Sequence, residues 1–212
     1  MNNIKIFSCY QNNISSKIVD YQRKIFDLFN IDLIQEYTKL NHSDYLDFKI
    51  NNTEFDIIIF FDIDCIPLKP NIVEYILEQL ADNNSIIGVE QANQTIGSDF
   101  VFAGPPCFGI KKDVFLKLGK PSFGYTNRGD TGAEFTHISR EMGINVKLFN
   151  ITSSQNKKWK CGKKRFGNGT IYDDLLYHQF ESRKYSESLE HSLNEYRFVI
   201  KCKEILEKYG NI

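Results

Sequence analysis

The sequence has little that would mark a secreted, membrane or nucleic-acid-binding protein. Its five cysteines are scattered and form no CxxC pair, so neither a zinc site nor a disulfide framework is indicated. No apolar run approaches the roughly 20 residues of a transmembrane helix, and the N-terminus has no charged leader followed by a long apolar core. The formal net charge of −1 gives no basis for binding nucleic acid. We therefore expect a cytoplasmic protein with no membrane span and no nucleic-acid partner.

What the chain does contain is an ordinary globular composition, with 42% hydrophobic and 25% charged residues. Its 212 residues fit one domain with a sizeable core. In the first ninety residues, strand-like and helix-like segments alternate. Strands are predicted over 4–10, 31–37, 57–62 and 85–89, and helices over 16–29, 43–48 and 71–82. This alternation favours an α/β fold with a mainly parallel central sheet flanked by helices.

The character of the sequence changes near residue 100, which we interpret as a boundary between two halves of one domain, 1–98 and 99–212. In the second half we predict strands over 100–102, 108–110 and 146–151, helices over 112–118, 131–142 and 189–209, an irregular passage over 103–106, and a loop over 153–170. Thr131 and Glu134 have the spacing of a capping box at a helix start. The buried stripe of the last helix is predicted to be Leu193, Tyr196, Ile200 and Leu206.

Two carboxylates follow directly on the most apolar run of the chain. The run over 57–61 has the β-branched and aromatic composition of a strand buried on both faces, and Asp62 and Asp64 come at its end. Ligands of open α/β sheets bind beyond the carboxyl ends of the strands. Side chains repeat every two residues along a strand, so the two aspartates are expected to point the same way. Two neighbouring carboxylates repel each other unless a cation lies between them. The pair therefore predicts a site for Mg²⁺ or Mn²⁺.

With the DxD motif at the end of a buried strand, after a βαβ unit, the chain resembles glycosyltransferases of the GT-A fold. The resemblance implies a Rossmann-like, mixed, mainly parallel sheet. It also implies a nucleoside-diphosphate sugar donor, with UDP-sugar favoured, and a glycan or other hydroxyl acceptor. Asp62 and Asp64 would hold Mn²⁺ or Mg²⁺, and a late histidine, His178 in this chain, would be the third ligand. The sequence does not name the sugar, the stereochemistry or the oligomeric state.

The same resemblance implies a catalytic carboxylate near a helix start in the second half. The segment 129–134 contains two candidates, Asp130 and Glu134. Glu134 fits the capping box, which would give it a structural role. Asp130 lies just outside the helix and is therefore the first choice for the base that takes the acceptor proton. If the reaction retains configuration, Asp130 would instead bind the donor sugar.

Further candidates are placed by the expected donor position. Residues expected to bind the nucleotide are Ser8, Tyr10, Gln11, His42, Asp47 and Ile63, together with Asp62. Tyr10 would stack on the base, although packing at the strand end is an equal alternative. Gly104 and Pro105 would let the backbone approach the sugar.

A basic segment over 157–165 is the sharpest charge feature, because six of its nine residues are cationic. In a GT-A fold such a loop can close over the diphosphate as a lid. Trp159 would then cover the sugar, and Lys160 and Lys163 would contact the phosphates. A solvated loop is the alternative.

Two other functions share parts of this pattern. In a haloacid-dehalogenase-type phosphatase, Asp62 would be the nucleophile and Asp64 the general acid. Against this, Cys65 and Ile66 stand where that family has Gly-Thr, and the motif lies about sixty residues into the chain. The second alternative is a non-catalytic nucleotide-sugar or glycan-binding domain, which would be expected to have a broken metal site.

Overall fold

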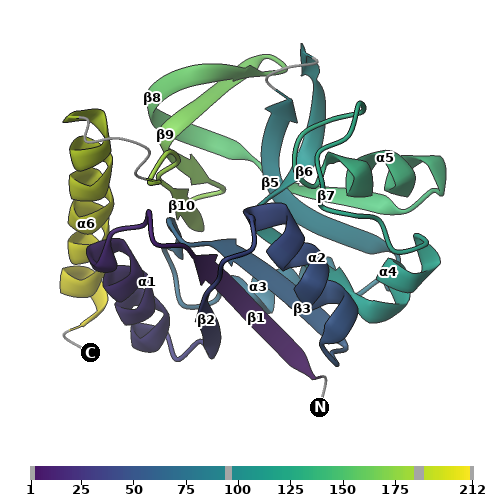
Figure 1. Cartoon of the computed structure of the whole chain (residues 1–212), viewed down its shortest axis with the longest axis horizontal. Helices are drawn as coiled ribbons and strands as arrows, with labels where there is room; N and C mark the ends of the chain where they lie inside the picture. The colour runs from purple at the N-terminus through teal and green to yellow at the C-terminus, as the bar shows by residue number, and fades with distance from the viewer. Residues whose placement is uncertain (1–2, 94–96, 184–188, 211–212) are drawn as a thin grey trace.

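The computed structural model of the protein describes residues 3–93, 97–183 and 189–210. A six-stranded sheet forms its centre, in the order β2-β1-β3-β6-β5-β7 (Figure 1). The strands are β1 (Ile4–Tyr10), β2 (Leu33–Tyr37), β3 (Ile57–Asp62), β5 (Ser85–Asn93), β6 (Gly97–Lys111) and β7 (Asn145–Phe149). β1 pairs in parallel with β2 and β3, and β5 with β7, whereas β6 runs antiparallel to both of its neighbours. The predicted mixed, mainly parallel sheet is confirmed.

Helices cover both faces of this sheet, which is why β3 is apolar from Ile57 to Phe61. Ile57, Ile59 and Phe61 belong to the core under α1 (Ser16–Leu28), α3 (Ile72–Gln79) and α6 (Leu189–Tyr209). Ile58 and Phe60 belong to the core under α2 (His42–Asn52), α4 (Lys112–Lys117) and α5 (Ala133–Glu141). A strand covered on both faces buries every side chain, so it has no polar alternation. Among the described residues, no helix is long and apolar enough to span a membrane.

A second, smaller sheet lies against the carboxyl ends of the first. Its order is β4-β10-β9-β8, with β4 (Cys65–Pro67), β8 (Ile151–Cys161), β9 (Lys164–Tyr172) and β10 (Leu176–His178). All its pairs are antiparallel, and Cys65 of β4 is the register partner of His178 of β10. This pairing brings the segment after β3 next to a residue more than a hundred positions further along the chain.

The predicted loop over 153–170 is wrong, because the segment forms the β8–β9 hairpin. β8 is the edge of its sheet and most of its side chains are at least partly exposed, so it lacks the apolar alternation by which strands are recognised. β9 buries polar residues, among them Asn168 and Thr170. Nδ2 of Asn168 donates to Oδ1 of Asn194 and the Thr170 hydroxyl contacts that of Ser154, and the sequence pattern does not reveal these tertiary contacts.

The strands predicted over 100–102 and 108–110 form the single strand β6, and the irregular passage predicted between them over 103–106 is a bulge in its pairing with β5. The register along β5 shifts between Gly88 and Val89, which pair with Phe108 and Gly104 respectively. Pro105 and Pro106 fall within this bulge, where a strand tolerates residues that cannot donate a ladder hydrogen bond.

The last helix has the predicted bounds but buries a different stripe. Leu193 and Tyr196 are exposed, and Ile200 and Leu206 are only partly covered. Among the residues of this helix whose burial the structure describes, the buried ones are Asn194, Phe198, Cys202 and Ile205. The helix offers two alternative sets of residues for burial, and its packing against α1 and β9 decides which set is buried.

Candidate functional site

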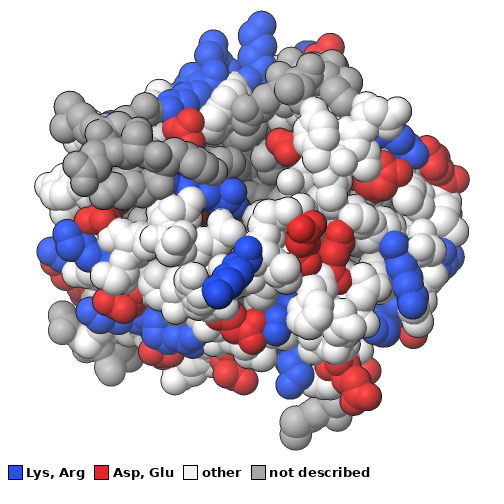
Figure 2. All heavy atoms as spheres, viewed as in Figure 1, with Lys and Arg blue, Asp and Glu red and all other residues white. Residues whose placement is uncertain are grey.

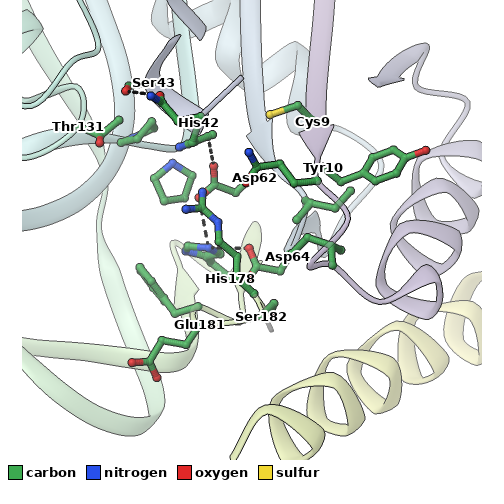
Figure 3. A pocket seen from close by; sticks show the side chains of 18 of the residues that line it. Cys9, Tyr10, His42, Ser43, Asp62, Asp64, Thr131, His178, Glu181 and Ser182 are labelled. Atoms are coloured by element: carbon green, nitrogen blue, oxygen red, sulfur yellow. Dashed lines mark hydrogen bonds and ion pairs between the residues drawn. The ribbon is translucent and has the colours of Figure 1, made fainter. Parts of the chain in front are cut away.

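A cavity of about 450 Å³ opens beyond the carboxyl ends of β1 and β3. This volume lies within the roughly 300–1,000 Å³ that is usual for small-molecule sites. Its lining comes from segments far apart in the sequence: the end of β1, the start of α2, the turn after β3, the bulge of β6, the segment before α5 and the chain after β10. Figure 3 shows the side chains that surround it. The site therefore lies where the fold class places ligands.

Three side chains that could hold a metal ion meet in this cavity. One ligand atom from each of Asp62, Asp64 and His178 lies within 4.8 Å of the others. His178 Nε2 is 3.0 Å from Asp64 Oδ1 and 3.5 Å from Asp62 Oδ2. Two carboxylates and one imidazole suit Mn²⁺ or Mg²⁺, and the cavity leaves space for ligands from a substrate. The residues present fit such an ion.

The convergence of the two aspartates does not follow from strand alternation. β3 ends at Asp62, and Asp64 lies in the turn that leads to β4. The backbone N–H of Gln179 donates to the carbonyl of Asp64 at 3.0 Å, which ties this turn to the end of β10. The turn and the strand pairing together place Asp64 beside His178.

Asp62 is ionised at neutral pH despite its position. Burial raises the pKa of its carboxyl group, but the charge and hydrogen bond of His42 and the charges of His178 and Arg183 lower it to about 2. His42 Nε2 lies 2.8 Å from Asp62 Oδ1. Figure 3 shows Asp62 between the two histidines. The site thus holds a permanent anion ready for a cation.

This depressed pKa predicts an acid-dependent loss of stability. A carboxyl group with a lowered folded-state pKa contributes stability that is complete above the unfolded-state pKa, about 4, and is lost as the pH falls towards 2. A shift of nearly two units corresponds to about 2 kcal/mol. We expect urea unfolding without metal to show this contribution between pH 4 and 2 in the wild type and not in Asp62→Asn. Parallel pH curves for the two proteins would contradict the assignment.

The residues expected to bind the nucleotide separate into two groups. Tyr10, Gln11, His42 and Ile63 line the cavity, with Tyr10 in an edge-to-face contact with Tyr37 at the ends of β1 and β2. Ser8 is almost fully buried within β1 and does not line the cavity.

Asp47 also lies away from the cavity lining. Its carboxylate accepts hydrogen bonds from the backbone N–H of Phe123, at 2.7 Å, and from the hydroxyl of Ser122, at 2.5 Å. It therefore anchors the segment that follows α4 to helix α2. Neither of the roles predicted from the sequence, lining the pocket or capping and solvation of the helix, describes this contact.

The two predicted catalytic carboxylates also occupy different environments. Asp130 lines the cavity, and its Oδ1 accepts a hydrogen bond from the N–H of Thr131 at 2.7 Å. Glu134 is not part of the lining and instead pairs with Arg128 at 3.1 Å. The predicted capping box is wrong, because α5 begins at Ala133 after Gly132, whose φ of 84° and lack of a side chain replace the threonine cap.

The basic segment does not cover the cavity. Trp159 packs between Phe166 and Phe180, at centroid distances of 5.3 and 5.5 Å. Lys160 and Lys163 are exposed around the turn of the hairpin, and neither they nor Trp159 line the cavity. Figure 2 shows Lys and Arg side chains projecting at the upper edge of the molecule, where Figure 1 places this hairpin. In this structure all three residues therefore lie away from the cavity lining, and their contact with a donor stays a prediction.

Pro105 lines the cavity, whereas Gly104 does not line it but leaves room for a residue that does. A Cβ atom at Gly104 would lie 2.2 Å from Oε1 of Gln91. The absence of a side chain at this position therefore leaves room for Gln91, whose side chain lines the cavity. Sequence reasoning missed Gln91, since it reads as an ordinary strand residue.

Arg183 is another lining residue that sequence reasoning missed. It follows β10 by five positions, and its charge contributes to the low pKa of Asp62. An arginine in a polar segment carries no pattern of its own. The one signal that could have pointed to Arg183 is that it lies only five positions after the predicted ligand His178.

Comparison with known proteins finds similar structures but no similar sequence. Neither the protein-family models nor the curated protein sequences match this chain. Among solved structures, the mannosyltransferase PcManGT from Pyrobaculum calidifontis, in complex with GDP-Man and Mn²⁺, is similar with a TM-score of 0.51 at 10% identity. The similarity covers 69% of this chain and 54% of that one, so the chain spans about half the length of the mannosyltransferase.

Two further structures are similar at lower scores. One is glucosyl-3-phosphoglycerate synthase from Mycobacterium tuberculosis with Mn²⁺, UDP and phosphoglyceric acid, with a TM-score of 0.45, 12% identity, and coverage of 70% and 68%. The other is a CMP:2-keto-3-deoxy-manno-octonic acid synthetase complexed with CTP, with a TM-score of 0.42, 12% identity, and coverage of 70% and 90%. The mannosyltransferase and this chain share the fold at a TM-score above 0.5, and the sheet order of this chain agrees with it. The chain has the GT-A fold, a Rossmann-like mixed sheet with helices on both faces.

Proposed function

We propose that this protein is a metal-dependent glycosyltransferase that moves a sugar from a nucleoside-diphosphate sugar, most favourably a UDP-sugar, to a hydroxyl group of a glycan or other acceptor. One observation carries the proposal. Asp62, Asp64 and His178 converge in a cavity at the carboxyl end of a central strand of a GT-A fold. A cluster of this composition, facing an open cavity, suits a cation shared with a diphosphate.

In this proposal Asp62, Asp64 and His178 hold Mn²⁺ or Mg²⁺. The bound ion supplies Lewis-acid stabilisation of the charge that grows on the departing diphosphate. His42 fixes the rotamer of Asp62 through its 2.8 Å contact. Arg183 adds a second positive charge at the rim of the same cavity, on the side of the acidic pair.

The remaining roles follow from position around the cavity. Tyr10 and Gln11, beyond the end of β1, face the region proposed for the nucleobase and ribose. Asp130 lies at the segment before α5 and is proposed to take the proton of the acceptor hydroxyl as its oxygen attacks the anomeric carbon. The bond from that carbon to the diphosphate oxygen breaks in the same displacement. If configuration is retained, Asp130 is proposed to bind the donor sugar.

Calorimetric titration tests the donor site directly. UDP is titrated into the protein with and without Mn²⁺, and GDP and CTP follow under the same conditions. Binding of UDP that requires Mn²⁺ supports the proposal and selects UDP-sugars for assays of transfer and of slow hydrolysis. Binding of GDP alone would change the donor but keep the reaction class. Binding of CTP alone would favour nucleotidyl transfer, and release of phosphate from a generic phosphate ester would favour the phosphatase.

A further inference from the structure

Gln22 is a polar side chain in an apolar stripe. It lies on α1 between Ile18 and Ile25, and all three side chains are fully buried. Burying an amide costs free energy unless its donors and its acceptor find partners. A leucine or methionine would suit the packing of this stripe better. The presence of glutamine therefore directs attention to what its amide contacts.

The amide of Gln22 reaches the backbone around the metal-ligand candidates. Its Nε2 donates to the carbonyl oxygen of Asp62 at 2.7 Å and to that of Cys65 at 3.0 Å. Its Oε1 accepts from Nε2 of Gln35 at 2.9 Å, and the same nitrogen of Gln35 donates to the carbonyl of Val19 at 3.1 Å. Two carbonyls on one side and a donor on the other fix the orientation of the Gln22 amide, because the reversed amide would set oxygen against oxygen.

These two carbonyls bracket the turn that carries Asp64. Asp62 is the last residue of β3 in the large sheet, and Cys65 is the first residue of β4 in the small sheet. Gln22 therefore ties both ends of the turn to one point on α1. The same Cys65 is the register partner of His178, so the clamp also acts on the strand pair that holds the histidine.

We propose that Gln22 is a positioning residue for the metal site, which sets the separation of Asp62 and Asp64 through the backbone of the turn between them. The inference rests on the proposed function in one respect, namely that the cluster binds a divalent ion. Gln35 holds the amide of Gln22 in the required orientation. Neither glutamine lines the cavity, so any effect they have on the ion passes through the backbone of the turn and of the strand pair that begins at Cys65.

A purely structural role makes a different prediction. If Gln22 only fills its place in the core, its replacement lowers the stability of the fold and leaves the metal affinity of the folded protein unchanged. If it positions the turn, the folded variant binds the ion more weakly. Loss of groups that orient metal ligands typically lowers metal affinity about 10- to 100-fold.

The experiment is a titration of Mn²⁺ alone, followed by electron paramagnetic resonance, on folded protein. The variants are Gln22→Met, which keeps the side-chain volume and removes the amide, and Gln35→Met, which removes the donor to Oε1 of Gln22. Ile25→Val, one turn along the same buried stripe, is the matched control for destabilisation of α1. We expect a 10- to 100-fold loss of Mn²⁺ affinity in Gln22→Met, a smaller loss in Gln35→Met, and wild-type affinity in Ile25→Val.

The outcomes separate the two proposals. Failure of the wild type to bind Mn²⁺, with or without UDP, overturns the proposed function and this inference with it. Wild-type affinity in Gln22→Met, with binding intact in the parent, overturns only the positioning role. If Gln22→Met does not fold, Gln35→Met decides, because it keeps Gln22 but removes the donor that holds its amide in the orientation needed for both contacts with the turn, and unchanged affinity there overturns the inference.

Discussion

Replacing Asp64 with asparagine is expected to abolish Mn²⁺-dependent binding of UDP and to reduce transferase activity at least 100-fold. The carboxylate would supply a direct metal ligand. Asp64 is almost fully buried, so a side chain from the protein surface cannot take over this ligand position. Loss of groups that only orient a ligand costs about 10- to 100-fold in affinity, and a lost ligand should cost more. The measurement is calorimetric titration of UDP with Mn²⁺, paired with an assay of sugar transfer.

The fold of this variant should survive in the absence of metal. Asparagine has the shape of aspartate, and its Oδ1 can still accept the hydrogen bond that His178 Nε2 makes to Asp64 at 3.0 Å. Asp20→Asn, at an exposed position of α1, removes the same charge far from the cluster and should bind UDP as the wild type does. Metal-dependent UDP binding by Asp64→Asn would show that the cluster is not the donor site.

Replacing Asp130 with asparagine is expected to lower kcat about 10²- to 10⁴-fold while the affinity for UDP and Mn²⁺ stays as in the wild type. General-base groups contribute factors of this size. Asp130 lines the cavity, but it is not one of the three residues of the candidate metal cluster. The measurement is kcat and KM for donor and acceptor, together with a UDP titration.

The result for Asp130 also distinguishes two chemical roles. A loss confined to kcat is the result expected of a base. A raised KM for the donor sugar, with little change in kcat, would indicate a sugar-binding residue and favour retention of configuration. Glu134→Gln is the internal comparison, because Glu134 pairs with Arg128 outside the cavity lining and its replacement should change stability more than catalysis. Equal losses of kcat in both variants would contradict the assignment of Asp130.

The β8–β9 hairpin shows why charge alone did not place a functional segment. Lys158 and Lys164 pair with Glu181 and Glu90, and Trp159 fills a small aromatic cluster. Lysine on the exposed strand at the edge of a sheet also discourages pairing with another chain. The ion pairs and the exposed edge of the sheet are therefore enough to explain a segment with six cations in nine residues, without contact with a ligand.

The order of apolar and amphipathic segments predicted the alternating strands and helices of the first half of the fold, but not the short strand β4. The helices α1 and α3 have a helical apolar period and β3 has a continuous apolar run, so these elements are recognisable from their own residues. The same is true of the position of Asp62 at the end of a buried strand. The hypothesis of a metal site followed from that position, since two neighbouring anions at a ligand-binding edge need a cation.

The tertiary structure decided what no local pattern contains. The pairing of Cys65 with His178 brings together residues of β4 and β10, and the pocket adds Arg183 and Gln91 to the predicted lining. The buried stripe of α6 and the hairpin in place of a loop depend on which surfaces meet. The sequence by itself determined the α/β class, the buried strand that ends at Asp62 with Asp64 two residues further on, and the kind of ion that such carboxylates suit. The resemblance to GT-A enzymes pointed to His178 and Asp130, but only the fold brought His178 against the two aspartates and Asp130 into the cavity lining, because those contacts join segments whose separation along the chain leaves no periodic trace.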